Sequence, residues 1–306
     1  MNATKRIEPC WRALASIRGC GLLPIPQRSH HALNAGDGVR SSEAQPNSFL
    51  WPAASGNVQP MTMTASARIL TTAARSLSRA AGRLKFGRPV VHVYNPLEYA
   101  WAAHALYLAR FGAGPKRVLF LGMNPGPYGM MQTGIPFGEV ASVRDWLELT
   151  APIDAPARTH PKRPIAGFAC SRSEVSGRRL WGLFRERFRT ADRFFAGHFV
   201  ANYCPLAFLE EGGRNLTPDR LPPAETAKLF AACDAHLRTL AGALKPEWVI
   251  GIGDFAEKRA RVVLGSGGDG RGFQFGKVLH PSPASPAANR DWAGAATRQL
   301  RELGVW

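Results

Sequence analysis

Hydrophobic positions recur with a regular spacing from about residue 68 to the end of the chain. Short hydrophobic runs predict β-strands, and longer segments with hydrophobic residues three and four positions apart predict helices. The predicted strands are 118–121, 199–203, 248–252 and 273–279. The predicted helices are 97–111, 139–150, 178–189, 223–244, 255–264 and 286–303. Strands that alternate with helices are typical of a parallel sheet. We therefore expect the α/β fold class, with three layers (α/β/α) around a central, mostly parallel four-stranded sheet.

The first 70 residues lack this spacing and mix Pro, Ser, Asn and Gly. We expect residues 1–70 to form a disordered N-terminal extension and residues 80–306 to form one domain. Two alternatives stay open for the extension. Translation could start at Met61 or Met63, or the segment could be an Arg-rich transit peptide, an interpretation that its three acidic residues oppose.

The charge balance points to a polyanionic partner. The chain carries 39 Lys and Arg against 22 Asp and Glu, a formal net charge of +17. Such a chain favours nucleic acid first and an acidic membrane surface second. An Arg-rich proteome would explain the same charge. No segment approaches the roughly 18 apolar residues of a membrane span, so we expect no membrane partner. The five cysteines form no Cys-x-x-Cys pair, so we predict no metal site and no cofactor.

Two stiff loops follow predicted strands. Residues 121–138 contain three prolines and five glycines, more than an ordinary turn needs, and present Asn124 at the end of strand 118–121. The second loop, 280–286, begins with His280 after strand 273–279. Ligands bind open α/β sheets at the carboxyl ends of the strands. We therefore expect an amide and an imidazole to meet in one site.

These two loops and three further segments resemble the single-strand-selective monofunctional uracil-DNA glycosylases, a family of the uracil-DNA glycosylase superfamily. The similar segments are 94–100, 122–130, 132–139, 171–177, 202–206 and 280–283. The resemblance implies that residues 80–306 are a uracil-DNA glycosylase-like catalytic domain. It implies a DNA repair enzyme that hydrolyses the N-glycosidic bond of uracil, and of uracils oxidised at C5 such as 5-hydroxymethyluracil. The products would be a free base and the abasic site that starts base excision repair.

Two residues match the catalytic positions of this family. Cleavage of the bond leaves an oxocarbenium-like sugar and an anionic base. By resemblance, Asn124 places the attacking water; a carboxamide can orient a water but cannot take its proton, so we expect a strongly dissociative reaction. His280 matches the residue that donates a hydrogen bond to uracil O2 as charge develops there, an interaction whose loss costs about 10²–10³-fold in rate.

Four residues match positions that bind the base. Asn202 aligns with the pyrimidine reader, which donates to O4 and accepts from N3–H. Phe137 aligns with the aromatic residue that stacks on the flipped base, worth about 1–3 kcal/mol. Met123 and Gly126 would line the pocket near C5. We expect a bulky side chain at Gly126 to abolish excision of hydroxymethyluracil.

The segment Pro281, Ser282 and Pro283 would wedge into the DNA helix where the base leaves. Animal members of the family have an arginine at the position of Ala284 in this chain. We expect Arg290 to take over the role of that arginine. The preference between single and double strands therefore stays open, and we expect both to be substrates. The arginines of the predicted helix 178–189 either face solvent or contact DNA.

The catalytic loops contain no lysine, so we expect no lyase step. We also expect the protein to be a monomer. It would act at the nucleoid in a bacterium or in the nucleus of a eukaryote. Three other functions stay open. Residues 251–256 fit the G-x-G-x-x-A pattern of a dinucleotide-binding oxidoreductase. The chain could also be a non-catalytic DNA-binding relative, or a superfamily member with specificity shifted to xanthine or hypoxanthine.

Overall fold

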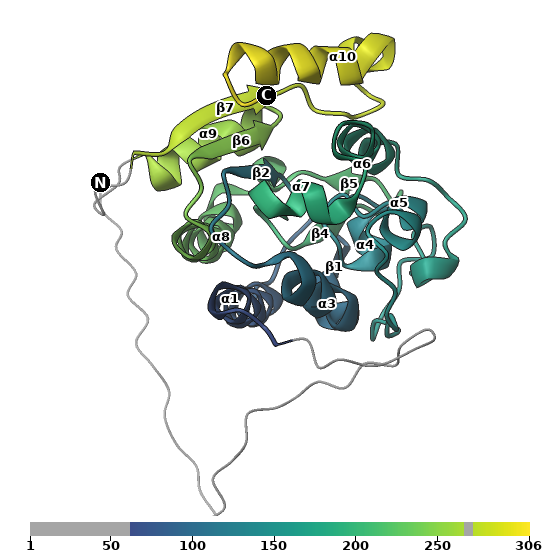
Figure 1. Cartoon of the computed structure of the whole chain (residues 1–306). Helices are drawn as coiled ribbons and strands as arrows, with labels where there is room; N and C mark the ends of the chain where they lie inside the picture. Colours follow the sequence, from purple (N-terminus) through teal and green to yellow (C-terminus); the bar gives the residue numbers. More distant parts are fainter. Residues whose placement is uncertain (1–61, 266–271) are drawn as a thin grey trace, which may run out of the picture. The chain divides into compact units, whose positions relative to one another are not determined.

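The computed structural model describes residues 62–265 and 272–306, which belong to one compact unit. Most of the predicted N-terminal extension, residues 1–61, lies outside the described residues. Figure 1 shows helices on both sides of a twisted central sheet, which is the predicted three-layer α/β/α arrangement.

The central sheet is parallel throughout and has four strands, as predicted. Its order is β3-β2-β6-β7. The strands are β2 (Val118–Gly122), β3 (His198–Asn202), β6 (Trp248–Ile252) and β7 (Gln274–Val278). The chain runs outward from the centre in both directions, so a topological switch point lies between β2 and β6. Gly122 pairs with Asn202, and Ile252 pairs with Val278, so the carboxyl ends of the strands are aligned along one edge.

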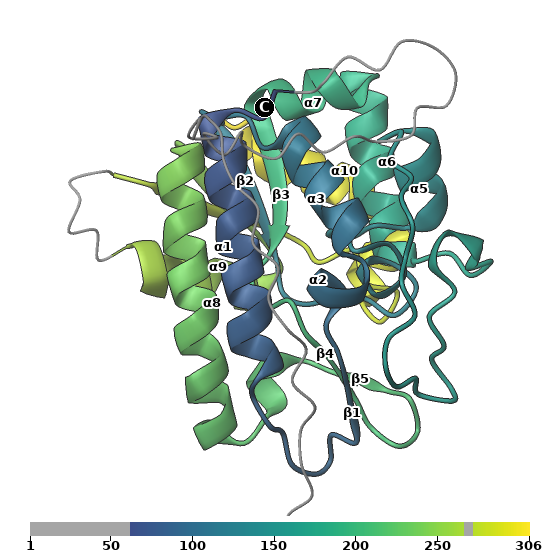
Figure 2. The same cartoon turned by 90° about the horizontal axis from the view of Figure 1, so that it is seen from below.

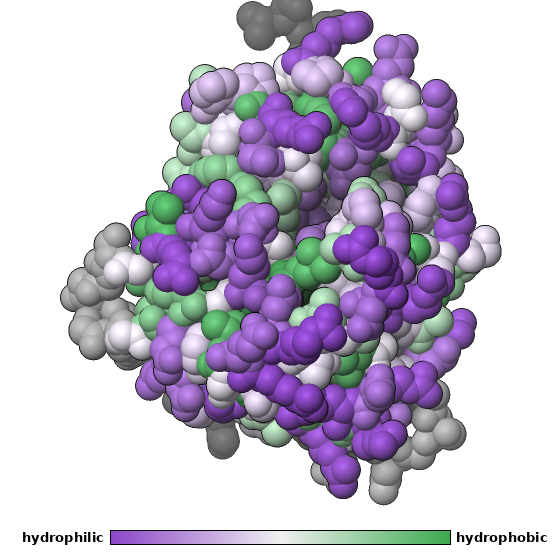
Figure 3. Space-filling model, turned by 90° about the horizontal axis from the view of Figure 1, so that it is seen from above, coloured by the Kyte–Doolittle hydropathy of each residue, from purple (hydrophilic) through white to green (hydrophobic). Residues whose placement is uncertain are grey.

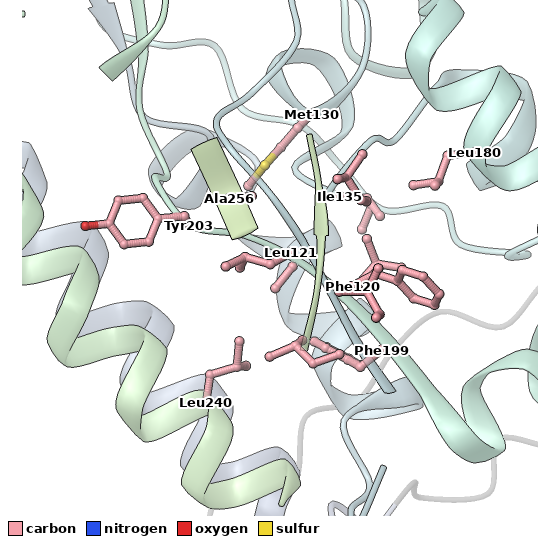
Figure 4. Packing of buried hydrophobic residues seen from close by; sticks show 14 of the residues in the cluster. Phe120, Leu121, Met130, Ile135, Leu180, Phe199, Tyr203, Leu240 and Ala256 are labelled. Carbon is pink, nitrogen blue, oxygen red and sulfur yellow. The ribbon is translucent and has the colours of Figure 1, made fainter. Parts of the chain in front are cut away.

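Successive residues of β2 point to opposite faces of the sheet, as Figure 4 shows for Phe120 and Leu121. On the Phe120 side lie α6 (Val175–Phe188), α7 (Ala191–Gly197) and α10 (Pro286–Glu302). The Phe120 ring lies 5.0 Å from the ring of Phe184 in α6. On the Leu121 side lie α8 (Pro223–Leu244) and α9 (Asp254–Leu264). Every residue of β2 is buried, which explains its continuous hydrophobic run.

Helix α1 (Ala65–Gly82) corrects the predicted domain boundary. It lies beside α8 in Figure 2, and its buried residues include Leu70 and Leu77. The folded domain therefore begins before residue 80, and the end of the segment predicted to be disordered is helical. The Thr64 hydroxyl accepts a hydrogen bond from the backbone N–H of Ala67 and so caps the helix.

A second, smaller sheet was not predicted. Its antiparallel order is β1-β4-β5. The strands are β1 (His92–Tyr94), β4 (Ala207–Leu209) and β5 (Asn215–Leu216). β4 and β5 follow β3 in the chain, so this sheet forms just beyond the carboxyl end of a central strand.

Two predicted helices differ from the observed ones. The predicted helix 97–111 is divided at Ala100 (φ −106°, ψ 28°) into α2 (Pro96–Tyr99) and α3 (Trp101–Phe111). The predicted helix 139–150 is the shorter α5 (Val140–Asp145), whose first turn is capped by Glu139. A short α4 (Met130–Thr133) and two 3₁₀ turns, Gly167–Ala169 and Pro218–Arg220, complete the fold.

The surface is largely polar on the face that carries α10. Figure 3 shows hydrophilic residues over most of this face, with small hydrophobic patches between them. Among the described residues, no helix combines the length and the hydrophobic character needed to cross a bilayer.

Candidate active site

A cavity of about 60 Å³ lies at the carboxyl edge of the central sheet. It is lined by Met123, Asn124, Gly126, Met130, Phe137, Glu174, Ser176, Asn202 and His280. The structure thus brings together all the residues predicted to act in catalysis or to bind the base. Met130, Glu174 and Ser176 were not predicted. A larger cleft of about 800 Å³, beside β1, contains none of the predicted residues.

The Asn124 amide is oriented by the chain around the small sheet. Its Nδ2 donates long hydrogen bonds of 3.4 Å to the carbonyl oxygens of Leu206, which directly precedes β4, and Leu216, which lies in β5. Asn215 of β5 ties the same region to the catalytic loop, because its Nδ2 donates to the Pro125 carbonyl at 2.8 Å. With its donors used in this way, Asn124 keeps Oδ1 as the atom that can accept a hydrogen bond from a water.

His280 follows β7 and is a neutral imidazole with a defined tautomer. The backbone N–H of Ser282 donates to Nδ1 at 3.1 Å, so Nδ1 is unprotonated and the ring proton lies on Nε2. Burial lowers the pKa of His280 to about 4. At neutral pH the ring can therefore donate one hydrogen bond from Nε2 without carrying a charge.

The glycines of the predicted dinucleotide motif have packing roles. Gly253 has a φ of +92°, and a Cβ there would lie 3.2 Å from Cβ of His280. A Cβ at Gly251 would overlap the backbone of Glu257 in α9. These glycines let β6 approach α9 closely and let His280 lie against the loop after β6, which accounts for the G-x-G spacing without a nucleotide.

Asn202 ends β3 and places an unpaired acceptor at the cavity. Its Nδ2 donates to the Met130 sulfur at 3.2 Å, while Oδ1 is buried with no hydrogen-bond partner within the described part of the chain. A buried polar atom without a partner is rare and favours a ligand that supplies the missing donor. A side chain at Gly122, the residue that pairs with Asn202, would overlap this oxygen and the Phe137 ring.

Phe137 is held in a strained backbone conformation. Its φ of 53° lies in the left-handed region, which costs a non-glycine residue about 1 kcal/mol or more. The Phe137 carbonyl accepts hydrogen bonds from the Trp181 indole at 3.0 Å and from the Glu139 backbone at 2.7 Å. The Phe137 ring lies 6.2 Å from the His280 ring, with 43° between the planes. A flat ligand stacked on Phe137 would thus have one edge near His280.

Glu174 is the functional candidate that the sequence analysis missed. It is the residue before α6, and its Oε2 accepts a hydrogen bond of 3.1 Å from the backbone N–H of Tyr128. Burial raises the pKa of this carboxyl group. Glu174 lies in segment 171–177, one of those that carried the family resemblance, but no role was assigned to it.

The loop that contains Pro281, Ser282 and Pro283 is anchored to α6. Nη1 of Arg179 donates to the carbonyl oxygens of Pro281 at 3.1 Å and Ser282 at 3.4 Å. Nη2 of Arg179 donates to Asn289 at 2.9 Å, and Asn289 donates in turn to the Pro283 carbonyl. Arg179 therefore supports the predicted DNA-contacting loop. Arg290 in α10 is exposed. Four other arginines in or directly after α6 are also exposed: Arg178, Arg185, Arg187 and Arg189.

Comparisons with known proteins identify the family of the chain. Residues 109–301 match the family model described as the uracil DNA glycosylase superfamily. The chain is 49% identical over 223 residues to the single-strand selective monofunctional uracil DNA glycosylase of Bos taurus, covering 73% of this chain and 81% of that protein. It is 48% identical over 229 residues to the protein of that name from Mus musculus, covering 75% and 81%.

A solved structure shares the fold. SMUG2 of Pedobacter heparinus superposes with a TM-score of 0.54 at 15% identity, over 76% of this chain and 97% of that chain. At this identity the likeness concerns the fold alone.

Proposed function

Because the chain belongs to the single-strand-selective monofunctional family of the uracil-DNA glycosylase superfamily, we propose that it hydrolyses the N-glycosidic bond of uracil in DNA and leaves an abasic site. The observation that carries this proposal is the orientation of three side chains around one cavity. Asn202 offers an unpaired acceptor, His280 a neutral donor and Asn124 an amide oxygen.

Recognition uses the edge and the face of a base flipped out of the stack. The orphaned Oδ1 of Asn202 accepts a hydrogen bond from N3–H of uracil, and its Nδ2 turns from the Met130 sulfur toward O4. Cytosine lacks a proton at N3 and would leave Oδ1 without a donor. That loss costs about 1–3 kcal/mol. Phe137 supplies the surface on which the base stacks.

Bond cleavage is assisted by His280. As the bond lengthens, negative charge builds on the base, and the Nε2–H group of His280 donates to O2. The imidazole is already neutral and already oriented by Ser282, so no proton has to be rearranged at the moment of reaction. The leaving base departs as an anion stabilised by this hydrogen bond.

Capture of the sugar cation is assisted by Asn124. Its Oδ1 orients a water toward C1′, and the proton of that water is lost only after the bond to C1′ has formed, because a carboxamide is no base. The cavity-lining residues include no lysine that could form a Schiff base with the sugar. The product is therefore an intact strand with one abasic site.

The substrate range has two further parts. The first is that the excised bases include uracils with a small polar group at C5, and the second is that the DNA can be single- or double-stranded. Support for the first comes from the cavity wall at Gly126, which is polar because the missing side chain leaves room for the Glu174 carboxylate. Support for the second comes from the net charge of +17 and from the exposed arginines of α6.

The test is release of uracil from a single-stranded oligonucleotide that contains one deoxyuridine, assayed in EDTA and developed with alkali. We expect strand breaks only after alkali. Asn124→Ala and His280→Ala should each lower kcat/KM by about 10²–10³-fold, whereas Thr239→Ala, on the exposed face of α8, should match the wild type. Absence of uracil release by the wild-type protein would refute the proposal.

A further inference from the structure

Glu174 is the one carboxylate among the residues that line the cavity, and the reaction described above does not use it. It reaches the cavity wall because two glycines make room for it. A Cβ at Gly126 would lie 2.7 Å from Oε2 of Glu174, and a Cβ at Gly129 would lie 3.0 Å from Cγ. The Tyr128 backbone N–H holds Oε2 at 3.1 Å. The carboxyl group therefore has a fixed place against Gly126.

The position of Glu174 relative to the base follows from the other contacts, and this step rests on the proposed function. A uracil with O2 at His280 and with N3 and O4 at Asn202 has used two of its edges. Its remaining edge, C5–C6, faces the part of the cavity formed by Gly126 and Glu174. A group attached to C5 is therefore directed at the carboxylate.

We propose that Glu174 sets the charge preference of the site at C5 of the base: it accepts a hydrogen bond from a hydroxyl donor there and rejects an anionic substituent. An ionised carboxylate has only acceptor sites, about four of them, and the Tyr128 N–H occupies one. A 5-hydroxymethyl group supplies a donor. A 5-carboxyl group has similar size but brings a second negative charge next to the first, in a partly buried position where water screens it weakly.

The test compares three bases in single-stranded oligonucleotides: uracil, 5-hydroxymethyluracil and 5-carboxyuracil. Glu174→Gln keeps the shape of the side chain and removes its charge. Because Glu174 lines the cavity and also holds the loop at Tyr128, uracil excision by each variant serves as the reference, and the ratios of the other two bases to uracil carry the test. Relative to uracil, kcat/KM for carboxyuracil should rise at least about tenfold, and that for hydroxymethyluracil should fall about tenfold, the strength of a hydrogen bond to a charged group.

Glu186→Gln, on the exposed surface of α6, is the matched control and should change no ratio. Glu174→Asp is the second variant. It withdraws the carboxylate from the wall but keeps its charge, and should shift both ratios in the same directions by smaller factors.

Three results would overturn the proposal. The wild type could excise carboxyuracil as fast as hydroxymethyluracil. Both ratios could stay within threefold in Glu174→Gln. Excision of all three bases could fall together, which would make Glu174 only a support for the loop at Tyr128. Failure of the proposed function looks different, because the wild type would then release no uracil at all.

Discussion

The backbone N–H of Ser282 donates a 3.1 Å hydrogen bond to Nδ1 of His280, two residues earlier in the chain. This local contact fixes the tautomer of the imidazole and leaves Nε2–H as its donor. The Ser282 carbonyl is held in turn by Arg179 of α6. The orientation of the His280 ring is therefore set by a backbone group, and it does not depend on the Ser282 side chain.

The Ser282 contact can be tested by comparing a variant that lacks the backbone donor with one that lacks only the side-chain hydroxyl. Ser282→Pro eliminates the N–H, so the tautomer of His280 is no longer fixed, and we expect kcat/KM for uracil to fall between about ten- and a thousandfold. Ser282→Ala keeps the N–H and loses the bond from the Ala284 backbone to the hydroxyl, so it should stay within about threefold. Equal activity of the two variants would show that this hydrogen bond does not orient the ring.

Two glycine-to-alanine variants distinguish an effect on the geometry of the site from an effect on the stability of the fold. In Gly122→Ala the new methyl group would overlap Oδ1 of Asn202 and the ring of Phe137, displacing both, so we expect uracil excision to fall at least about a hundredfold and stability to fall by about 1–3 kcal/mol.

The matched change is Gly182→Ala in the middle of α6. No atom lies within 4 Å of the added methyl group, so activity should be unchanged and the helix should gain about 0.5–1 kcal/mol. Activity assays and urea unfolding measure the two effects. Full activity of Gly122→Ala would contradict the packing described here.

Two buried histidines predict how stability depends on pH. Burial lowers the pKa values of His104 and His198 to about 4, from about 6.5 in the unfolded chain. Between these values the unfolded state binds more protons than the folded state, so stability falls as the pH drops from 6.5 toward 4. Each histidine should cost about 2 kcal/mol between pH 7 and pH 5.

Urea unfolding at pH 7 and pH 5 tests this. Nδ1 of His104 donates to the Gly134 carbonyl at 2.8 Å, and the amide of an asparagine can make that bond without titrating. His104→Asn should therefore reduce the difference in unfolding free energy between the two pH values by about 2 kcal/mol, whatever its effect at pH 7. An unchanged difference would mean that His104 is protonated in the folded protein at pH 5.

The central sheet could be predicted from the sequence because β2, β3 and β6 are almost entirely buried hydrophobic runs, and β7 alternates between polar and hydrophobic residues. The small sheet could not. β1 and β4 have three residues and β5 has two, which is too few for an alternating pattern to stand out. The sequence prediction leaves helix α1 largely outside the domain because alanines and a serine occupy most of its buried positions, so the buried face has few large hydrophobic residues.

Some residues of the candidate site could likewise be predicted from the sequence, and others could not. Asn124 and His280 follow predicted strands, and Asn202 lies at the end of one. The structure brings all three into one cavity, although their functional roles stay predictions. Glu174 could not be predicted, because its place depends on contact with Gly126, far earlier in the chain. Likewise, Arg179 is one of several arginines in α6, and only the folded structure shows that it holds the loop after His280.

The two sheets divide the work of the proposed reaction between them. Asn202 ends β3 and His280 follows β7, both in the parallel sheet. Asn124 follows β2 of the same sheet, but its amide is held by carbonyl groups at Leu206 and Leu216, around the antiparallel one. Over evolutionary time, substitutions around β4 and β5 can therefore retune how fast a base is removed and leave unaltered which base is chosen. Descendants of this fold can acquire a new catalytic speed and a new substrate in separate mutational steps.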